Sequence, residues 1–273
     1  MTAKPQNSKE EVVKTAVMFP GQGAQYPGMG KDLYEASQAV KDIFAAAQSV
    51  VSFPLQSVLF EGTAEDLKQT DVAQVAITLV NLSAAALLNE RGVQFDAVAG
   101  FSLGEYAALV TAGVIDIADV FPLVAERGKI MSEESAALVG DDGAPGMAAV
   151  MGLVPEKVAE ALAGRDDVFA ANLNSPQQTV ISGTAAGLIA AQDLLKQAGA
   201  KRVLPLKVSG PFHSPLLKKA AERLEAYLEK ITFSDPKVPL FSNVTGAQVK
   251  TGAEAKKLCV EHVVTPVQWV AQE

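Results

Sequence analysis

The chain lacks the features that would place it outside the reducing interior of a cell. It has one cysteine among 273 residues, so no disulfide can form within it, and this favours a reducing compartment. No apolar run reaches the ~18 residues that a membrane-spanning helix needs, and residues 1–16 are too polar for a secretory signal. We therefore expect a cytoplasmic protein that contacts no membrane.

Basic residues and metal-binding patterns are also scarce. The 23 Lys and Arg residues are outnumbered by 31 Asp and Glu residues, for a net charge of -8. Nucleic acids and anionic lipids are polyanions that need a basic surface, so we expect neither as a partner. Cys259 has no second Cys or His at a metal-ligand spacing, and we therefore expect no metal and no bound cofactor.

Hydrophobic residues make up 49% of the chain, which is enough for a full core. Residues 15–19 and 95–99 have the short apolar pattern of buried strands, and residues 75–89 and 103–112 have the Ala- and Leu-rich pattern of helices. This alternation predicts an α/β fold with a parallel sheet at its core. The larger part resembles an α/β-hydrolase domain.

The pattern changes between residues 140 and 207. The expected elements are a strand at 147–151, a helix at 155–163, a strand at 178–182, a helix at 185–198 and a strand at 202–208. Their order predicts a small ferredoxin-like domain at 140–207 that interrupts a large catalytic domain formed by 1–139 and 208–273. In the returning part we expect a helix at 214–230 and a strand at 237–243.

Ser102 is the candidate nucleophile. It lies in the sequence Gly-Phe-Ser-Leu-Gly at 100–104, which matches a nucleophile elbow between a strand and a helix. A glycine-rich turn with a helix-capping serine would show the same five residues, but the position after one strand and before one helix favours the elbow.

A serine nucleophile needs a base, and the chain has only two histidines. His213 lies in a proline-framed loop between an expected strand and helix, where functional side chains are often presented. His262 lies in an apolar stretch, which is more typical of a packed or surface histidine at a helix end. His213 is therefore the predicted base by elimination.

Two further groups complete the candidate site. In an elbow, the backbone amide of Leu103 can donate to an oxyanion, and a second donor can come from the glycine-containing loop at 20–23. Arg127 lies on an expected helix. It is either solvated, paired to a neighbour such as Glu126, or turned inward, where its planar fork would bind a carboxylate.

Seven ordered motifs resemble those of the malonyl-CoA:acyl carrier protein transacylases of bacterial-type fatty acid synthesis. The resemblance runs from about Thr15 to the end of the chain. The motifs are Phe-Pro-Gly-Gln-Gly-Ala-Gln at 19–25, Gly-Phe-Ser-Leu-Gly-Glu-Tyr at 100–106, Arg-Gly at 127–128, Gly-Met-Ala-Ala at 146–149, Asn-Leu-Asn-Ser-Pro at 172–176, Gly-Pro-Phe-His at 210–213 and Pro-Val-Gln-Trp at 266–269.

The resemblance implies a role for each residue. Ser102 would carry the malonyl group, His213 would act as its base, the Gln22 and Leu103 amides would form the oxyanion hole, and Arg127 would bind the malonyl carboxylate. Met131 would line the acyl pocket, and Phe212 would favour malonyl over methylmalonyl. The backbone carbonyl of His262 would orient the catalytic histidine, at a position where the family often has Gln.

The resemblance also implies a two-step reaction. The malonyl group would pass from malonyl-CoA to the serine and then to the phosphopantetheine thiol of an acyl carrier protein, releasing coenzyme A between the steps. We expect a monomer that meets its carrier transiently, through Lys218 with Lys219 or through Lys201 with Arg202.

The sequence departs from the family pattern at two further positions. Phe101 stands where the family often has His, and the family continues past the Trp269 region with another strand.

Three alternatives remain open at this point. A serine hydrolase would need an acid between the serine and the histidine, for which Asp166 or Asp167 could be proposed. An acyltransferase of polyketide assembly would share the chemistry and differ in its carrier. A binding protein with an inactive site is disfavoured because Ser102, His213 and Arg127 are all present.

Overall fold

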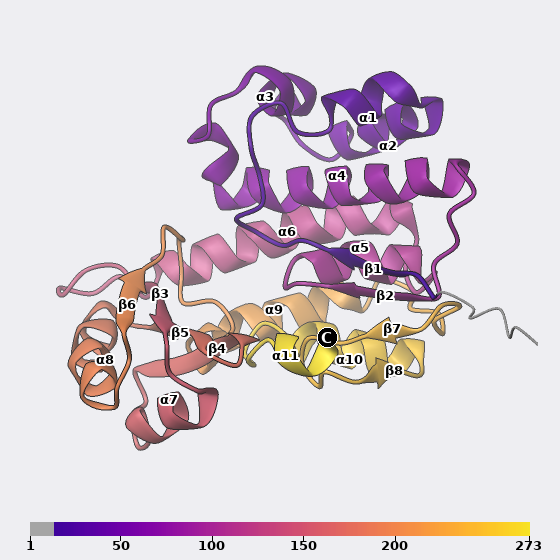
Figure 1. Ribbon diagram of the computed structural model, residues 1–273. Helices are drawn as coiled ribbons and strands as arrows, with labels where there is room; N and C mark the ends of the chain where they lie inside the picture. The colour runs from indigo at the N-terminus through magenta and orange to yellow at the C-terminus, as the bar shows by residue number, and fades with distance from the viewer. Residues whose placement is uncertain (1–13) are drawn as a thin grey trace, which may run out of the picture.

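A computed structural model describes residues 14–273 and contains two four-stranded sheets with helices around them (Figure 1). The strand orders are β1-β2-β7-β8 and β4-β5-β3-β6. Residues 1–13, which hold most of the polar N-terminal segment, lie outside the described residues. The predicted mixture of helices with a sheet that contains parallel strands is confirmed.

The first sheet carries the strand that leads to Ser102. Its strands are β1 (Ala16–Phe19), β2 (Ala97–Gly100), β7 (Leu240–Phe241) and β8 (Gln248–Val249). β2 pairs in parallel with β1 on one side and with β7 on the other, and β8 is antiparallel to β7. Among residues 14–273, no strand pairs with the outer edge of β1, and the Met18 side chain of this strand is exposed.

Helices beside the first sheet form most of the core. They are α1 (Lys31–Ala36), α2 (Gln38–Gln48), α3 (Leu55–Glu61), η1 (Asp66–Lys68), α4 (Thr70–Glu90), α5 (Gly104–Thr111) and α6 (Ile117–Ala136). α5 contacts β1 and β2, and α1 and α2 pack on α4. α4 is long and apolar enough to cross a membrane by composition alone, but 67% of its most apolar window is buried. It packs on α2, α5 and α6, which identifies it as a core helix.

The second sheet is antiparallel throughout and has its own hydrophobic cluster. Its strands are β3 (Gly146–Met151), β4 (Val168–Ser175), β5 (Gln178–Gly183) and β6 (Arg202–Pro205). The same segment of chain forms the helices α7 (Pro155–Ala161) and α8 (Ala185–Gln197). The sequence prediction missed β4, whose register against β5 shifts twice. These irregularities break the period of two that identifies a strand in a sequence.

The returning chain differs in detail from its predicted elements. The helix expected at 214–230 is divided into η2 (Pro215–Leu217) and α9 (Lys218–Leu228), and the strand expected at 237–243 is only the two residues of β7. Two helices, α10 (Gly252–Glu261) and α11 (Trp269–Gln272), end the chain, and α11 contacts β4 of the second sheet.

The buried side of α4 should carry much of the stability. Leu79 is fully buried in the main hydrophobic cluster, whereas Leu88 on the same helix is 38% exposed. We expect Leu79→Ala to lower the free energy of unfolding by about 2–5 kcal/mol, because it leaves a cavity in the core. The matched change Leu88→Ala should alter it by about 0.5 kcal/mol or less. Urea denaturation of both variants measures the difference, and equal losses would contradict this assignment of the core.

Candidate active site

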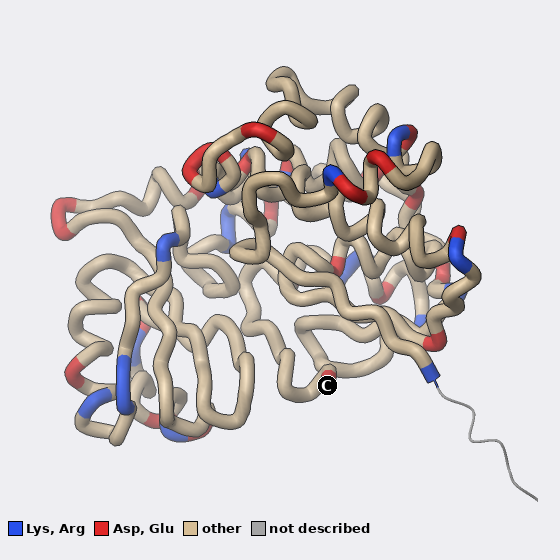
Figure 2. Tube along the Cα trace, turned by 45° about the horizontal axis from the view of Figure 1, so that its top comes forward, with Lys and Arg blue, Asp and Glu red and all other residues tan. Residues whose placement is uncertain are grey.

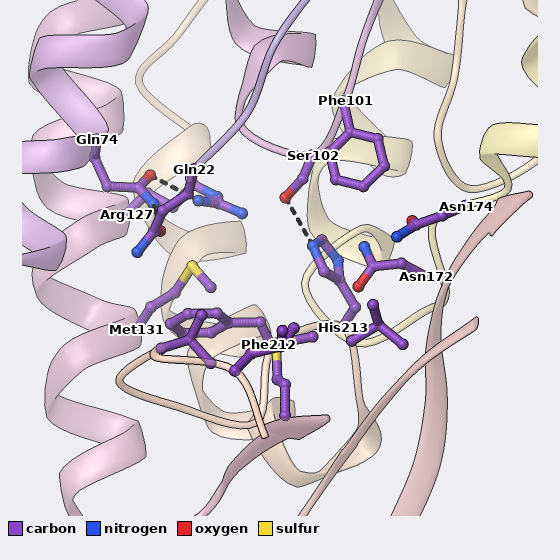
Figure 3. A pocket seen from close by; sticks show the side chains of 14 residues that line it. Gln22, Gln74, Phe101, Ser102, Arg127, Met131, Asn172, Asn174, Phe212 and His213 are labelled. Atoms are coloured by element: carbon purple, nitrogen blue, oxygen red, sulfur yellow. Dashed lines mark hydrogen bonds between the residues drawn. The ribbon is translucent and has the colours of Figure 1, made fainter. Parts of the chain in front are cut away.

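Ser102 lies on a sharp turn between β2 and α5, and its backbone φ is 50°. A β-carbon on Gly100 would lie 2.0 Å from the carbonyl carbon of Gly104. One on Gly104 would lie 2.1 Å from the carbonyl oxygen of Phe19. Such contacts are too short for any side chain, so both glycines are needed for the turn. The turn projects Ser102 into a pocket, as an elbow requires (Figure 3).

The hydroxyl oxygen of Ser102 lies 2.7 Å from Nε2 of His213 (Figure 3). On the other side of the ring, Nδ1 lies 2.9 Å from the backbone carbonyl oxygen of His262. A carbonyl only accepts, so Nδ1 carries the proton and donates, and Nε2 is free to accept from the serine. His213 has a φ of 57°, and it and Ser102 are the only non-glycine residues among 14–273 with positive φ. Strained backbone of this kind concentrates at functional sites.

The two histidines are buried beside each other, with ring centroids 4.9 Å apart. Burial lowers the pKa of His213 to about 4; the hydrogen bond to the His262 carbonyl opposes this, and the charge of Arg127 adds to it. Burial also lowers the pKa of His262, as do His213 and Arg127. Both rings are therefore neutral at neutral pH, and His213 is ready to accept a proton.

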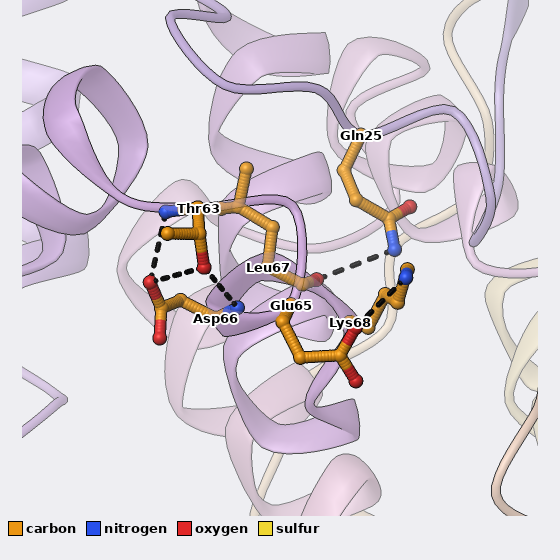
Figure 4. Close-up of polar contacts among 6 residues, drawn as sticks. All are labelled: Gln25, Thr63, Glu65, Asp66, Leu67 and Lys68. Atoms are coloured by element: carbon orange, nitrogen blue, oxygen red, sulfur yellow. Dashed lines mark hydrogen bonds and ion pairs between the residues drawn. The ribbon is translucent and has the colours of Figure 1, made fainter.

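The amides of Gln22 and Leu103 face no competing acceptor. Within the described part of the chain, neither N–H donates a hydrogen bond. The Gln22 loop is held by Gln25, whose side-chain oxygen accepts from the Gly23 amide at 2.7 Å and whose nitrogen donates to the Leu67 carbonyl at 3.2 Å. Figure 4 shows this link between the loop and η1. Both amides are thus available to an oxyanion at Ser102.

Arg127 projects from α6 and is only 2% exposed. One of its terminal nitrogens donates to the side-chain oxygen of Gln74 at 2.7 Å, and its guanidinium carbon lies 5.3 Å from the centre of the Tyr106 ring. No carboxylate among residues 14–273 forms an ion pair with it, and its Nε has no hydrogen-bond partner. A buried cation without a counter-ion is costly, so this arrangement favours an anionic ligand.

The predicted residues meet in one pocket of about 220 Å³. Its lining is Gln22, Gln74, Phe101, Ser102, Arg127, Met131, Met147, Asn172, Asn174, Val180, Leu206, Val208, Phe212 and His213. Leu103 and His262 are buried and do not line this pocket, but the backbone carbonyl of His262 contacts His213. Among residues 14–273, no group of three or more His, Cys, Asp or Glu side chains could hold a metal ion.

A family model described as the acyl transferase domain matches residues 17–272. The chain belongs to the acyl transferase domain family. A malonyl CoA-acyl carrier protein transacylase of Bacillus subtilis is 42% identical to this acyltransferase over 263 residues, which are 94% of this chain and 80% of the relative. The resemblance seen in the seven motifs is thereby confirmed.

Solved structures agree with this assignment. An acyl carrier protein S-malonyltransferase of Vibrio cholerae has a TM-score of 0.88 at 37% identity and covers 95% of this acyltransferase and 84% of that chain. A structure described as a type II PKS acyl-carrier protein in complex with its malonyl-transacylase has a TM-score of 0.87 at 37% identity. The match covers 94% of this acyltransferase and 83% of that chain.

Some residues of the site were not predicted from the sequence. Gln74 lies just before the apolar run at 75–89, and only the structure shows its bond to Arg127. Asn172 and Asn174 belong to a quoted motif but had no assigned role. Asn243 accepts from the Ser102 amide, and its own backbone amide donates to Glu105. Glu105 belongs to the quoted motif at 100–106 and Asn243 to the strand expected at 237–243, but neither had an assigned role in this acyltransferase.

The lowered pKa of His213 predicts that the rate of Ser102 labelling falls only at an unusually low pH, so the acid limb of its pH profile should lie well below 6.5. A base with a pKa of about 4 stays unprotonated as pH falls through 6.5, so Ser102 should remain reactive down to about pH 5. Because Arg127 contributes to this lowering, Arg127→Leu should move the limb to higher pH, whereas Arg223→Leu on α9 should leave it in place. The rate of Ser102 labelling by a sulfonyl fluoride between pH 4 and 8 measures this. A limb near 6.5 in the wild type would contradict it.

Proposed function

We propose that this acyltransferase moves the malonyl group of malonyl-CoA to the phosphopantetheine thiol of an acyl carrier protein, through an ester on Ser102, in fatty acid synthesis. The observation that carries the proposal is the buried Arg127, which has no ion-pair partner among residues 14–273 and lies in the same pocket as the Ser102–His213 pair. A serine with a base supports acyl transfer, and an internal cation supports an acyl group that ends in a carboxylate. The names of the relatives support the same substrate and carrier.

In the first half-reaction, the Ser102 oxygen attacks the thioester carbonyl while its proton passes to Nε2 of His213. The negative charge on the carbonyl oxygen is stabilised by the amides of Gln22 and Leu103. When the intermediate collapses, the carbon–sulfur bond breaks and the proton on His213 goes to the departing sulfur. Coenzyme A leaves as a thiol, and malonyl-Ser102 remains.

The second half-reaction reverses these roles with a new thiol. His213 takes the proton of the carrier thiol, the sulfur attacks the ester carbonyl, and Ser102 regains a proton as it departs. Because coenzyme A leaves before the carrier thiol attacks the covalent ester, the kinetics are of the ping-pong type. We propose no metal or bound cofactor for either half, and coenzyme A enters only as part of the substrate and as product.

Arg127 selects the acyl group in this proposal. Its fork binds the malonyl carboxylate, and contacts with Gln74 and Tyr106 hold the guanidinium in place. Met131 and Phe212 bound the same pocket and leave little room for a branched acyl group.

The open face of the second sheet provides a path from Ser102 to the surface. Met147 and Leu206 line the Ser102 pocket, while Met151 and Arg202 line a second hollow on the same face. Met147 at the Ser102 pocket and Met151 at the second hollow are four residues apart on β3, which corresponds to a distance of about 13 Å. We propose that this face holds the phosphopantetheine arm that coenzyme A and the carrier share.

The basic residues at β6 are the better candidates for the carrier surface. Lys201 and Arg202 line the second hollow and form no ion pair among residues 14–273, whereas Lys218 lies 3.9 Å from Glu222. Figure 2 shows basic segments at β6 in a chain whose charges are otherwise mixed. Local attraction of this kind can guide an acidic carrier to an acidic enzyme.

The alternatives find less support. A hydrolase triad would need an acid beside His213, but that position holds the His262 carbonyl, and Asp167 pairs instead with Arg165 at 2.6 Å. A polyketide carrier shares the phosphopantetheine arm, and one related transacylase is bound to such a carrier. It therefore remains the second candidate partner.

The remaining proposals concern organisation. We propose that the first sheet belongs to a hydrolase-like domain made of 1–139 and 208–273, and the second to a ferredoxin-like domain at 140–207. The order β3-α7-β4-β5-α8-β6 supports the latter. We propose a cytoplasmic monomer that meets its carrier transiently.

Mass spectrometry of the intact protein tests the covalent step. After mixing with malonyl-CoA and quenching in acid, we expect a malonyl increment that is absent from Ser102→Ala, because the acceptor oxygen is gone. Arg127→Ala should slow its formation by about 100-fold or more, since a buried charge pair with the substrate is lost. Adding carrier protein should discharge the ester. Steady release of free malonate without any response to the carrier would favour the hydrolase.

Steady-state kinetics test the basic surface. We expect Arg202→Ala to raise KM for the carrier and for malonyl-CoA by about 3–10-fold with little change in kcat, because one anion contact is lost. The control Lys219→Ala, on α9, should leave both values in place. The opposite result would move the proposed carrier surface to the start of α9.

A further inference from the structure

Asn243 continues the first sheet past the end of β7. β7 pairs with β2 through Leu240 and Val98 and then ends at Phe241. Two residues later, the Asn243 side-chain oxygen accepts from the Ser102 amide at 2.7 Å, and its nitrogen donates to the Gly100 carbonyl at 2.5 Å. In a parallel ladder, one residue bonds in this way to the two residues that flank its partner. The side-chain amide of Asn243 therefore replaces a backbone peptide beside the turn.

Glu105 determines which way the Asn243 amide faces. Oε2 of Glu105 accepts from the Asn243 backbone amide at 2.8 Å and also from the Asn243 side-chain nitrogen. The side-chain nitrogen thus faces two acceptors, Oε2 and the Gly100 carbonyl. A flipped amide would set its oxygen against both of them. Only one orientation satisfies the contacts, and it points the amide oxygen at the Ser102 N–H.

This network lies behind the strained residue of the site. Ser102 has a φ of 50°, and its N–H is the group that Asn243 holds. Both supporting side chains are buried, with Glu105 4% and Asn243 0% exposed. Without the bond to the amide, the turn could relax toward a more common backbone conformation. Such a change would move the hydroxyl away from Nε2 of His213.

We propose that Glu105 and Asn243 are positioning residues for the transfer reaction: Glu105 orients the Asn243 amide, and Asn243 holds the Ser102 amide so that the hydroxyl stays within reach of His213. The inference rests on the proposed function for its substrate, but the reactivity of Ser102 can be measured without that substrate.

The charge of Glu105 is not needed for this role. Burial raises the pKa of Glu105 to about 7, although the hydrogen bonds from Asn243 and Ser242 and the charge of Arg127 act to lower it. A proton on Oε1 leaves Oε2 free to accept both bonds, so the neutral acid also orients the amide. Glu105→Gln, whose carbonyl oxygen can take the place of Oε2, is therefore the matched conservative variant.

Two measurements on the full chain test the proposal. One is the rate at which phenylmethanesulfonyl fluoride labels Ser102, followed by intact mass, and the other is the kinetics of malonyl transfer. We expect Glu105→Ala and Asn243→Asp to slow labelling and kcat together, by about 10–100-fold, because the nucleophile is misplaced. KM for malonyl-CoA should change by less than about 3-fold, since its binding residues are intact. Glu105→Gln should stay within about 3-fold of the wild type in both.

Asn243→Asp is informative because it keeps the size of the side chain. It leaves an oxygen facing the Ser102 amide but places a second oxygen against the Gly100 carbonyl and Glu105. Adding Glu105→Gln should restore part of the labelling rate, because the glutamine amide can donate to that oxygen. Absence of any recovery in the double variant would count against the proposed orientation.

A structural control separates positioning from loss of folding. Leu195→Ala removes a fully buried side chain of the second cluster, so it should lower the melting temperature and leave the labelling rate of the folded protein unchanged. The proposal fails if folded Glu105→Ala labels at the wild-type rate, or if its loss equals the unfolded fraction by circular dichroism. If the wild type labels at Ser102 but transfers no malonyl group, the proposed function fails while the comparison of variants still decides this inference.

Discussion

The left-handed backbone of Ser102 is the constraint on which the site depends. It exists because β2 runs directly into α5 with no room for a side chain at Gly100 or Gly104. The same close approach brings the start of α5 against the end of β1, where the loop with Gln22 begins. The proposed nucleophile and both proposed oxyanion donors are therefore positioned by one packing contact between two strands and a helix.

Electrostatics in the interior follow from burial. Arg127, Glu105 and His213 are all nearly inaccessible to water, so each feels the cost of charge in a low-dielectric region. The pKa of His213 falls and that of Glu105 rises, which favours the neutral form of both. Arg127 carries a positive charge, as arginine side chains in proteins do. The pocket thus presents one positive charge beside a neutral base, which suits a substrate with one carboxylate.

Local patterns predicted the elements around the proposed nucleophile well, because β1, β2 and α5 have regular apolar sequences. They failed where the backbone is irregular. β4 contains two register shifts, and β7 is only two residues long and is followed by Asn243, whose side chain bonds to the end of β2. Such features depend on the neighbouring strand, which a single segment of sequence does not contain.

The sequence by itself determined the elbow around Ser102, the choice of His213 from two histidines, and the family through its ordered motifs. Only the tertiary structure decided that Arg127 turns inward and pairs with no carboxylate of the described residues, and that Asn243 bonds to the Ser102 amide from 141 positions away. The physical reason is that residue type and spacing fix local backbone geometry. The direction and the partners of a buried side chain depend on packing between segments far apart in the chain.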